Sequence, residues 1–192
     1  MKIIGFVGLP GSGKGEASKI ARELGLSVVV MGDVIRQEAA RQGLEPTDQN
    51  LGRIGNALRE KKTGRDLVVV DGLRSGAEAE FFRSQADEFY LIEVWAAADA
   101  RLGRLEKRGR PDDPKVCGEV GGNASAEGQA KSNSATALEE RECREKGWGL
   151  ARAMERADYR IDNSGSLEDL RRKVVKLVGE IEKGVSGESM VG

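Results

Sequence analysis

The chain has 192 residues, of which 31 are basic, 32 are acidic, 26 are glycine and none is histidine. Without an imidazole, histidine-based nucleophilic triads, histidine-ligated zinc and haem held by a proximal histidine are all excluded. The two cysteines, Cys117 and Cys143, cannot form a four-thiolate metal site by themselves, and their spacing is not that of a CxxC redox motif. Chemistry must therefore use lysine, arginine, carboxylates, serine or a bound ion.

Length and charge together favour one domain. At 192 residues the chain can bury a substantial core, and we place the domain at residues 1–183. The net charge of −1 gives no global attraction to nucleic acid or to an anionic membrane, so neither is expected as the main ligand. No apolar stretch approaches the roughly 20 residues of a membrane span, and the low cysteine count suits a reducing compartment. We expect a cytoplasmic protein.

Short apolar runs predict five β-strands. Because these runs are continuous rather than alternating, each strand is expected to be buried on both faces. In chain order they lie at 3–7, 26–31, 67–70, 90–95 and, more weakly, 159–161. Amphipathic segments predict helices at 17–24 and 167–181, the second behind a Ser166-x-x-Asp169 capping box. Strands that alternate with helices predict a parallel α/β sheet.

Two segments interrupt this pattern. Residues 118–137 contain a single large aliphatic side chain, Val120. A segment that buries so little cannot offset the entropy of ordering, so we predict a flexible insertion there. The tail at 184–192 is predicted to be disordered for the same reason.

The strongest local pattern lies between the first predicted strand and the first predicted helix. It reads Gly8-Leu9-Pro10-Gly11-Ser12-Gly13-Lys14-Gly15 and is followed by Glu16. The spacing is that of the phosphate-binding loop G-x-x-x-x-G-K. Glycines let successive N–H groups turn toward an anion, the helix N-terminus adds its positive dipole end, and Lys14 supplies an ammonium for the β and γ phosphates. We predict that residues 8–16 bind the phosphates of ATP.

Two other interpretations of this loop compete with phosphate binding. A glycine-rich turn can be purely structural, although five glycines between residues 5 and 15 exceed what one tight turn needs. A dinucleotide-binding turn would need a third glycine where the chain has Glu16, and no lysine at the helix start. The residue after Lys14 is Gly15, in place of the Ser or Thr that commonly ligates magnesium.

The GKG form of the loop, with Pro10 inside it, resembles the nucleoside monophosphate kinase branch of P-loop proteins, adenylate kinases in particular. Three further motifs follow in that family's order. MGDVIR at 31–36 resembles an acceptor-binding motif, DGLR at 71–74 a motif for magnesium and the acceptor, and RLEKRGRPDD at 104–113 the start of the lid. The likeness covers roughly residues 1–115 and 138–180.

Several longer strings are most similar to those of archaeal adenylate-kinase-related ATPases, and dephospho-coenzyme A kinases share much of this layout. The strings are GLPGSGKGE, MGDVIR, DGLRS, RGRPDDP and ADYRIDNSGSLEDL. The resemblance implies a P-loop NTPase fold: a three-layer α/β/α sandwich whose five parallel strands take the order 2-3-1-4-5, with a small lid. It implies acceptor-binding helices at about 32–62 and a lid at about 101–145.

The resemblance also implies residues for the acceptor and the metal. Asp33, Arg36 and Arg74 would bind the acceptor, and Asp71 would hold Mg²⁺ through water. Asp71 ends a buried strand, which is where open α/β sheets place their ligands. It could instead cap the next turn, and Asp33 could serve as the N-cap of the following helix.

The lid of the related kinases implies catalytic cations. Arg104, Arg108 and Arg110 would close over the transferring phosphoryl group that Lys14 holds. Arg101, Arg104 and Arg108 recur at i, i+3 and i+7, so they share one face of a predicted helix, which a bound polyphosphate would neutralise. A solvated basic face is the plain alternative. Farther on, Arg141 and Arg144 are candidates for returning lid arginines or for surface pairs with their acidic neighbours.

These features support one leading function and one rival. Phosphoryl transfer needs aligned charge more than covalent catalysis, so a chain without histidine can perform it with lysine, arginine and Mg²⁺. We predict an ATP- and Mg²⁺-dependent phosphotransferase that acts on a nucleoside monophosphate or a similar small phosphorylated acceptor. Asn163 and Gly165 stand where related kinases contact adenine.

The alternative is an ATP-hydrolysing switch whose lid reports nucleotide state to a protein or RNA partner. It is favoured by Glu16, where adenylate kinases carry threonine, and by the short stretch between Leu58 and Asp66.

Overall fold

The computed structural model describes residues 1–31, 67–108 and 124–184. Its centre is a parallel five-stranded sheet in the order β2-β3-β1-β4-β5. The strands are β1 (Lys2–Val7), β2 (Ser27–Val30), β3 (Leu67–Asp71), β4 (Glu88–Trp95) and β5 (Tyr159–Asp162). All five predicted strands and their predicted order are confirmed, and the architecture is the α/β sandwich expected from the sequence.

Strand β1 lies in the middle of the sheet and contributes side chains to two separate hydrophobic cores. Its neighbours are β3 and β4, with Lys2 paired to both Leu67 and Glu88. Side chains alternate between the two faces: Ile4 and Phe6 belong to one buried cluster, whereas Ile3 and Val7 belong to the other. The continuous apolar run is therefore required, because both faces are covered.

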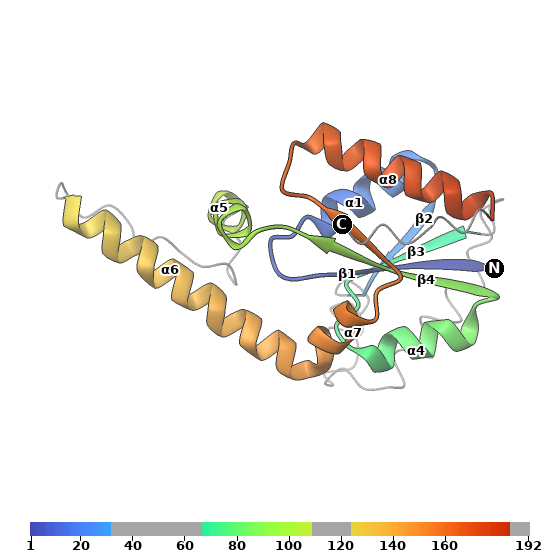
Figure 1. The fold of residues 1–192 in the computed structure, drawn as a ribbon, viewed down its shortest axis with the longest axis horizontal. Helices are drawn as coiled ribbons and strands as arrows, with labels where there is room; N and C mark the ends of the chain where they lie inside the picture. The colour runs from blue at the N-terminus through green and yellow to red at the C-terminus, as the bar shows by residue number, and fades with distance from the viewer. Residues whose placement is uncertain (32–66, 109–123, 185–192) are drawn as a thin grey trace, which may run out of the picture.

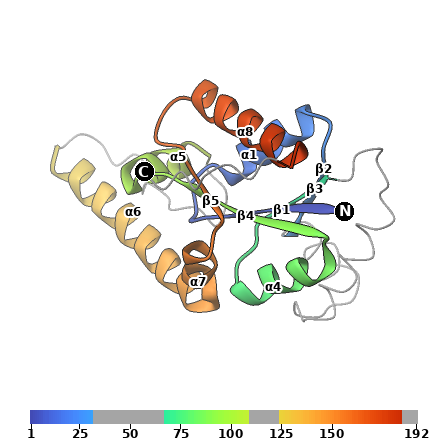
Figure 2. The ribbon, with the colours of Figure 1, turned by 45° about the vertical axis from the view of Figure 1, so that its right-hand side comes forward.

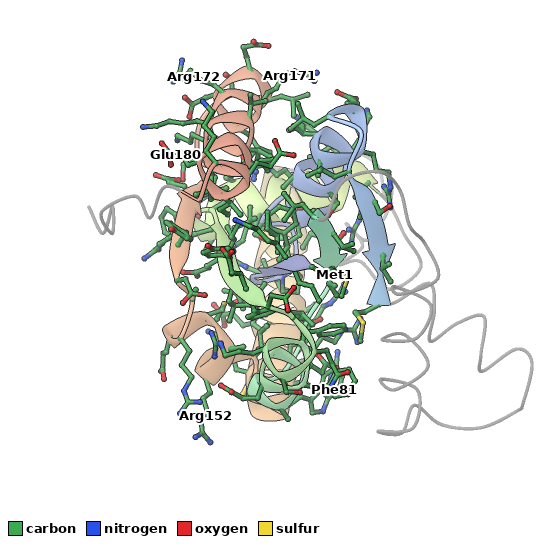
Figure 3. All side chains as sticks on the ribbon, turned by 90° about the vertical axis from the view of Figure 1, so that its right-hand side faces the viewer. Met1, Phe81, Arg152, Arg171, Arg172 and Glu180 are labelled. Carbon is green, nitrogen blue, oxygen red and sulfur yellow. The ribbon has the colours of Figure 1, made fainter. Side chains whose placement is uncertain are left out.

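Helices cover the sheet on both sides (Figure 1). On one face lie α1 (Lys14–Glu23) and α8 (Leu167–Glu182), and on the other lie α4 (Gly76–Gln85) and α7 (Ala151–Glu155). Viewed from the amino-terminal end of β1, the outer surface of α8 carries Arg171, Arg172 and Glu180 (Figure 3). Phe81 and Arg152 lie at the opposite side of the molecule. The fold thus has helix, sheet and helix layers.

Serine caps begin two of these helices. In α8 the Ser166 hydroxyl accepts a hydrogen bond from the Asp169 N–H at 3.2 Å, as the sequence predicts. In α4 the box is reciprocal: Ser75 Oγ accepts from the Glu78 N–H at 3.2 Å, and Glu78 Oε2 accepts from the Ser75 N–H at 3.2 Å. These caps fix where each helix starts after a strand.

Two helices lie beyond the carboxyl end of the sheet. Helix α5 (Ala98–Arg108) follows β4, and α6 (Ala124–Glu145) is a 22-residue helix that extends well past α5 (Figures 1 and 2). After α6, one π-helical turn at Lys146–Leu150, in which Gly149 has φ 97°, leads into α7. The described parts of the region expected to form a lid, residues 101–108 and 124–145, therefore sit at the edge where parallel strands end.

The prediction of a flexible insertion is wrong for residues 124–137, which form the first part of α6. Alanine, glutamate, glutamine and lysine favour a helix through backbone propensity, without burying large side chains. Counting aliphatic residues was therefore a poor guide to this segment. Residues 118–123, most of the tail and the acceptor-binding helices expected at 32–62 lie outside the described residues.

Within the described ranges, no helix combines the length and apolar character that crossing a bilayer requires.

Candidate functional site

The glycine loop connects the end of β1 to the start of α1, with Lys14 as the first helical residue. Gly11 and Gly13 have φ of 76° and 104°, which residues with a side chain rarely adopt. A Cβ at Gly13 would lie 2.1 Å from Asn163 Nδ2, and one at Gly11 would lie 2.6 Å from the Arg101 carbonyl oxygen. Backbone conformation and close packing both require glycine at positions 11 and 13. A purely structural turn would not need both constraints at two positions.

The outer side of the loop is held by side chains from distant elements. Asn163 Nδ2 donates to the Ser12 carbonyl at 2.8 Å, and Arg104 Nη1 lies 3.4 Å from the carbonyl oxygens of Gly11 and Ser12. Because a trans peptide unit points its N–H opposite to its C=O, the bond to the Ser12 carbonyl leaves the Gly13 N–H pointing away from Asn163, whereas the Ser12 N–H donates to the Leu9 carbonyl at 3.1 Å. Gly13 directly precedes α1, where backbone N–H groups suit an anion.

Lys14 folds back over this loop. Its Nζ donates to the Gly8 carbonyl at 2.5 Å and to the Leu9 carbonyl at 3.1 Å. Burial away from water lowers the pKa of Lys14 from 10.5 to about 8. Four charged neighbours also act on this pKa, two carboxylates raising it and two guanidinium groups lowering it: Asp71, Glu145, Arg74 and Arg141. The ammonium therefore sits in a crowded, poorly hydrated site that an incoming anion would relieve.

Asp71 is the last residue of β3 and is buried, with 7% of its surface exposed. It pairs in register with Phe6 of the central strand, so it lies at the sheet edge beside the loop. Its carboxylate raises the pKa of Lys14, and its role as a magnesium residue stays a prediction. A hard carboxylate oxygen at this position suits Mg²⁺.

Arg74 follows three residues later and is exposed. Its backbone N–H donates to Glu78 Oε2 at 2.6 Å, which anchors the turn before α4. It also lies close enough to Lys14 to lower that residue's pKa. The structure thus brings Arg74 and Lys14 to one site, while the other two predicted acceptor residues, Asp33 and Arg36, lie outside the described residues.

The three arginines predicted to share one face of α5 differ in burial. Arg101 is 5% exposed, so the solvated-face alternative is wrong for this residue. Arg104 is partly buried, and its Nη2 donates to the Asn163 carbonyl at 2.6 Å. Arg108 is exposed at the end of the helix, and Arg110 lies outside the described residues. The first two arginines therefore contact backbone carbonyl oxygens of the phosphate loop.

Asn163 serves the loop through its side chain. It is 5% exposed, and its backbone N–H donates to the Trp95 carbonyl at 2.7 Å. Gly165 packs at the start of α8, where an added Cβ would lie 3.2 Å from Asp169 Oδ2. Adenine contact at these two residues stays a prediction; what the structure adds is that Asn163 holds Ser12 in place.

Glu16, in the first turn of α1, is exposed and lines a shallow groove between α1 and α8. The other lining residues come from the same two helices: Lys19, Ile20, Glu23, Leu167, Glu168 and Arg171. The carboxylate is thus on the α8 side of α1, where its charge can be solvated.

Helix α6 contributes acidic residues that the sequence did not single out. Glu142 pairs with Arg101, and Arg141 Nε donates to Glu145 Oε1 at 3.1 Å. Arg141 thus has the acidic partner that the surface-pairing alternative predicted, yet it also lies near Lys14, whereas Arg144 is exposed. The i, i+4 spacing of charges in EERECRE was the signal available beforehand.

Metal ligands are sparse in the part of the chain that the structure describes. There, no group of three or more histidine, cysteine, aspartate or glutamate residues could hold an ion unaided. Cys143 is an exposed free thiol, and Cys117 lies outside the described residues. A Mg²⁺ ion at Asp71 would therefore share its coordination with water and phosphate oxygens, which is the common arrangement for this ion.

Comparison with known proteins places this site in a family context. The model of a family described as an AAA domain matches residues 7–115. The UPF0200 protein of Methanothrix thermoacetophila is 45% identical over 94% of this chain and 98% of that protein. The UPF0200/UPF0201 protein of Archaeoglobus fulgidus is 42% identical over 98% of this chain, which spans 58% of that relative.

A solved structure shares the fold. The gluconokinase of Sinorhizobium meliloti superposes with a TM-score of 0.59 at 16% identity, covering 96% of this chain and 95% of that one. At this identity the likeness shows the P-loop kinase fold alone. The loop, Lys14 and Asp71 occupy the carboxyl edge of the sheet, where such folds place ligands.

Proposed function

The chain belongs to the UPF0200 family, and from the arrangement of its phosphate loop we propose that it is an ATP- and Mg²⁺-dependent phosphotransferase of the nucleoside monophosphate kinase type. It transfers the γ-phosphoryl group of ATP to a nucleoside monophosphate or a similar small phosphorylated acceptor. A cytoplasmic location goes with the use of ATP and is part of the proposal.

The observation that carries the proposal is the state of Lys14. Its ammonium is desolvated, has a pKa of about 8 and rests on two loop carbonyls. Cations are left in such surroundings where an anionic ligand completes the site. The backbone N–H groups at the start of α1 supply further donors for phosphate oxygens.

The residues present fit Mg²⁺ that arrives with the nucleotide. Asp71 offers a buried carboxylate beside Lys14, and Gly15 offers no hydroxyl ligand. Asp71 would therefore hold the ion through water. When bound, Mg²⁺ neutralises charge on the β and γ phosphate oxygens.

The reaction then needs alignment and charge. The bond between the γ phosphorus and the β–γ bridging oxygen breaks as a bond forms to an oxygen of the acceptor phosphate. Lys14 and the loop hold the donor, Arg74 and Arg36 hold the acceptor phosphate, and Arg108 and Arg110 neutralise the transferring group. An acceptor phosphate is already ionised, so no general base is required and the absence of histidine is no obstacle.

Coupled assays test this directly. The purified chain is given ATP and Mg²⁺ with a panel of acceptors: AMP, CMP, UMP and GMP, which offer a phosphate oxygen, and dephospho-coenzyme A and gluconate, which offer a hydroxyl. ATP consumption that requires one of the monophosphates supports the proposal. Consumption that is the same without any acceptor contradicts it.

A matched pair of variants links the activity to the loop. Lys14→Met should abolish transfer, because the cation at the β and γ phosphates is lost. Lys176→Met removes an exposed lysine of α8, whose Nζ lies 3.9 Å from Glu180, and should leave transfer unchanged. Equal activity of the two variants would refute the role given to Lys14.

A second candidate is an ATP-hydrolysing switch that acts on a protein or RNA partner. It is favoured by the Archaeoglobus relative, whose name joins the UPF0200 and UPF0201 designations and of which this chain spans 58%. A partner chain of the second designation would then be the receiver of the nucleotide signal. Acceptor-independent hydrolysis that rises when this partner is added would support the switch over the kinase.

A further inference from the structure

Arg101 of α5 joins three parts of the molecule. Its Nε donates to the Ala96 carbonyl at 3.0 Å, in the connection after β4. Its Nη1 lies 3.4 Å from the Pro10 carbonyl of the phosphate loop and also pairs with Glu142 of α6. One nitrogen therefore serves both the loop and α6.

The backbone of α5 is in contact with the loop at the same place. A Cβ at Gly11 would lie 2.6 Å from the Arg101 carbonyl oxygen and 3.0 Å from its Cβ. Helix α5 and the loop consequently cannot shift independently at this point, because no space separates them.

Helix α6 is held near its carboxyl end. Leu138 is buried, with 4% of its surface exposed, and Glu142 lies one helical turn later on the same face. From there α6 extends away from the sheet, past α5 (Figures 1 and 2). Because the described contacts of Leu138 and Glu142 lie near the carboxyl end of α6, a small rotation of the helix at Glu142 gives a larger displacement toward its amino end.

The two ion pairs of Glu142 differ in kind. The side chains of Arg101 and Glu142 are 6% and 12% exposed, and removing one partner of a buried pair leaves an uncompensated charge. Lys146 is 46% exposed and its Nζ lies 3.7 Å from the other carboxylate oxygen of Glu142. An exposed contact of this sort contributes little.

We propose that Arg101 and Glu142 are positioning residues that transmit the occupancy of the phosphate loop to helix α6. Phosphate in the cradle competes with the Gly8 and Leu9 carbonyls for Lys14, next to the peptide that carries the Pro10 oxygen. Because Arg101 Nη1 is shared, its contacts with Pro10 and Glu142 support each other. Bound phosphate therefore strengthens the hold on Glu142 and changes the position of α6, and loss of Glu142 weakens phosphate binding. By linkage, a change at α6 alters affinity for nucleotide by the same factor. The inference rests on the proposed binding of ATP phosphates, and does not depend on which acceptor is used.

The chain contains a natural fluorescent side chain close to Glu142, at the carboxyl end of α6. Of its two tryptophans, Trp148 lies in the turn directly after α6 and is 54% exposed. A Trp95→Phe reference chain leaves Trp148 as the only indole. Titration with a non-hydrolysable ATP analogue and Mg²⁺ then gives both an affinity and the amplitude of the Trp148 fluorescence change.

Two variants in this reference chain test the pair. Glu142→Gln should weaken nucleotide binding by about tenfold, as expected when a close charge pair is broken, and should lose most of the Trp148 signal at saturation. Lys146→Gln removes the exposed partner of the same carboxylate and should keep both values. Arg101→Lys retains the charge but not the forked donors, so it should also lose signal amplitude, and it replaces Glu142→Gln if that variant fails to fold.

The outcomes separate this inference from the proposed function. Full signal amplitude and unchanged affinity in both Glu142→Gln and Arg101→Lys would overturn the coupling alone. No nucleotide binding by the reference chain would overturn the function and the coupling together. When Glu142→Gln and Arg101→Lys are combined, a loss of affinity and signal no larger than the greater single loss shows that the two residues act as a unit. Additive losses contradict the proposal. A KM for ATP that rises while kcat is kept also supports a positioning role.

Discussion

The phosphate loop and helix α6 are built in opposite ways. The loop is short, and side chains of Asn163, Arg104 and Arg101 hold its carbonyls from outside. Helix α6 has 22 residues, and the described contacts that hold it near its carboxyl end include the buried Leu138 and the Arg101–Glu142 pair. The difference teaches that the loop takes its shape from contacts along its backbone, whereas α6 is positioned by a few side chains.

The largest effect is expected where a side chain is added inside the enclosed loop. In Gly13→Ala the new Cβ would lie 2.1 Å from Asn163 Nδ2, at φ 104°. Strain and overpacking together should cost about 3 kcal/mol or more of unfolding free energy. Binding of ATP should fall by roughly a hundredfold or more, because the cradle loses its shape. Chemical denaturation and calorimetry measure the two losses.

Gly179→Ala serves as the control for that substitution. Nothing lies within 4 Å of the position where its Cβ would be placed in α8. Helix propensity predicts a gain of about 0.5–1 kcal/mol. If Gly13→Ala were equally well tolerated, the description of the loop as enclosed would be wrong.

The next effect concerns the anchor of α6. Leu138→Ala removes a buried side chain and should cost about 2–4 kcal/mol, concentrated in this helix. Hydrogen exchange should show lost protection for the amides of 138–145 and little change in β1. Glu139→Ala alters the neighbouring exposed residue and should change neither. Equal loss of protection in α6 and β1 would mean that α6 unfolds with the sheet and is not separately held.

A smaller effect is expected when pH changes the protonation of Lys14 at the phosphate loop. With a pKa of about 8, Lys14 loses its proton between about pH 7 and pH 9, and ATP affinity should fall by about tenfold over that interval. Binding near pH 8 should also take up protons, which calorimetry in buffers of different ionisation enthalpy detects. Affinity that stays constant to pH 9 would show that Lys14 is well hydrated.

The pH dependence of stability has the opposite sign to that of ATP affinity. The unfolded chain keeps this proton up to a pKa near 10.5. Between pH 8 and this value the unfolded state binds more protons, so the contribution of Lys14 to the unfolding free energy rises with pH. Lys14→Met should remove this slope.

The smallest effect is expected at the start of α8, just after the strand that leads to Asn163. Ser166→Ala removes a cap whose Oγ accepts from the Asp169 N–H at 3.2 Å and should cost about 1 kcal/mol. ATP affinity should be nearly unchanged, because Asn163 is fixed by its own bonds to Trp95 and Ser12. A large loss of affinity would show that the helix start also shapes the loop.

Much of the fold was predictable because the strands are simple apolar runs. Residues such as Ile3 and Ile4 face opposite cores, so both must be apolar, and that requirement is visible in one sequence. The phosphate loop was predictable because its glycines and Lys14 are consecutive in the chain. The start of α6 was missed because helix propensity in a polar, alanine-rich segment leaves no apolar periodicity.

The contacts that organise the site could not be predicted in the same way. Arg101 and Glu142 are 41 residues apart, and Asn163 reaches Ser12 across 151 residues. Charged and amide side chains look alike in sequence whether they are exposed or buried, so only their neighbours distinguish them. Trp148, the reporter for α6, carried no signal that set it apart from a core aromatic.

The sequence by itself determined the parallel α/β architecture, the position of the loop and the type of ligand that the loop suits. These follow from local rules: apolar runs form strands, and glycines beside a helix start form an anion cradle. The tertiary structure decided that Arg101 and Arg104 support the loop from behind and that Glu142 ties α6 to it. Such roles depend on which distant residues meet, and that is fixed only when the sheet brings the ends of β1, β4 and β5 together.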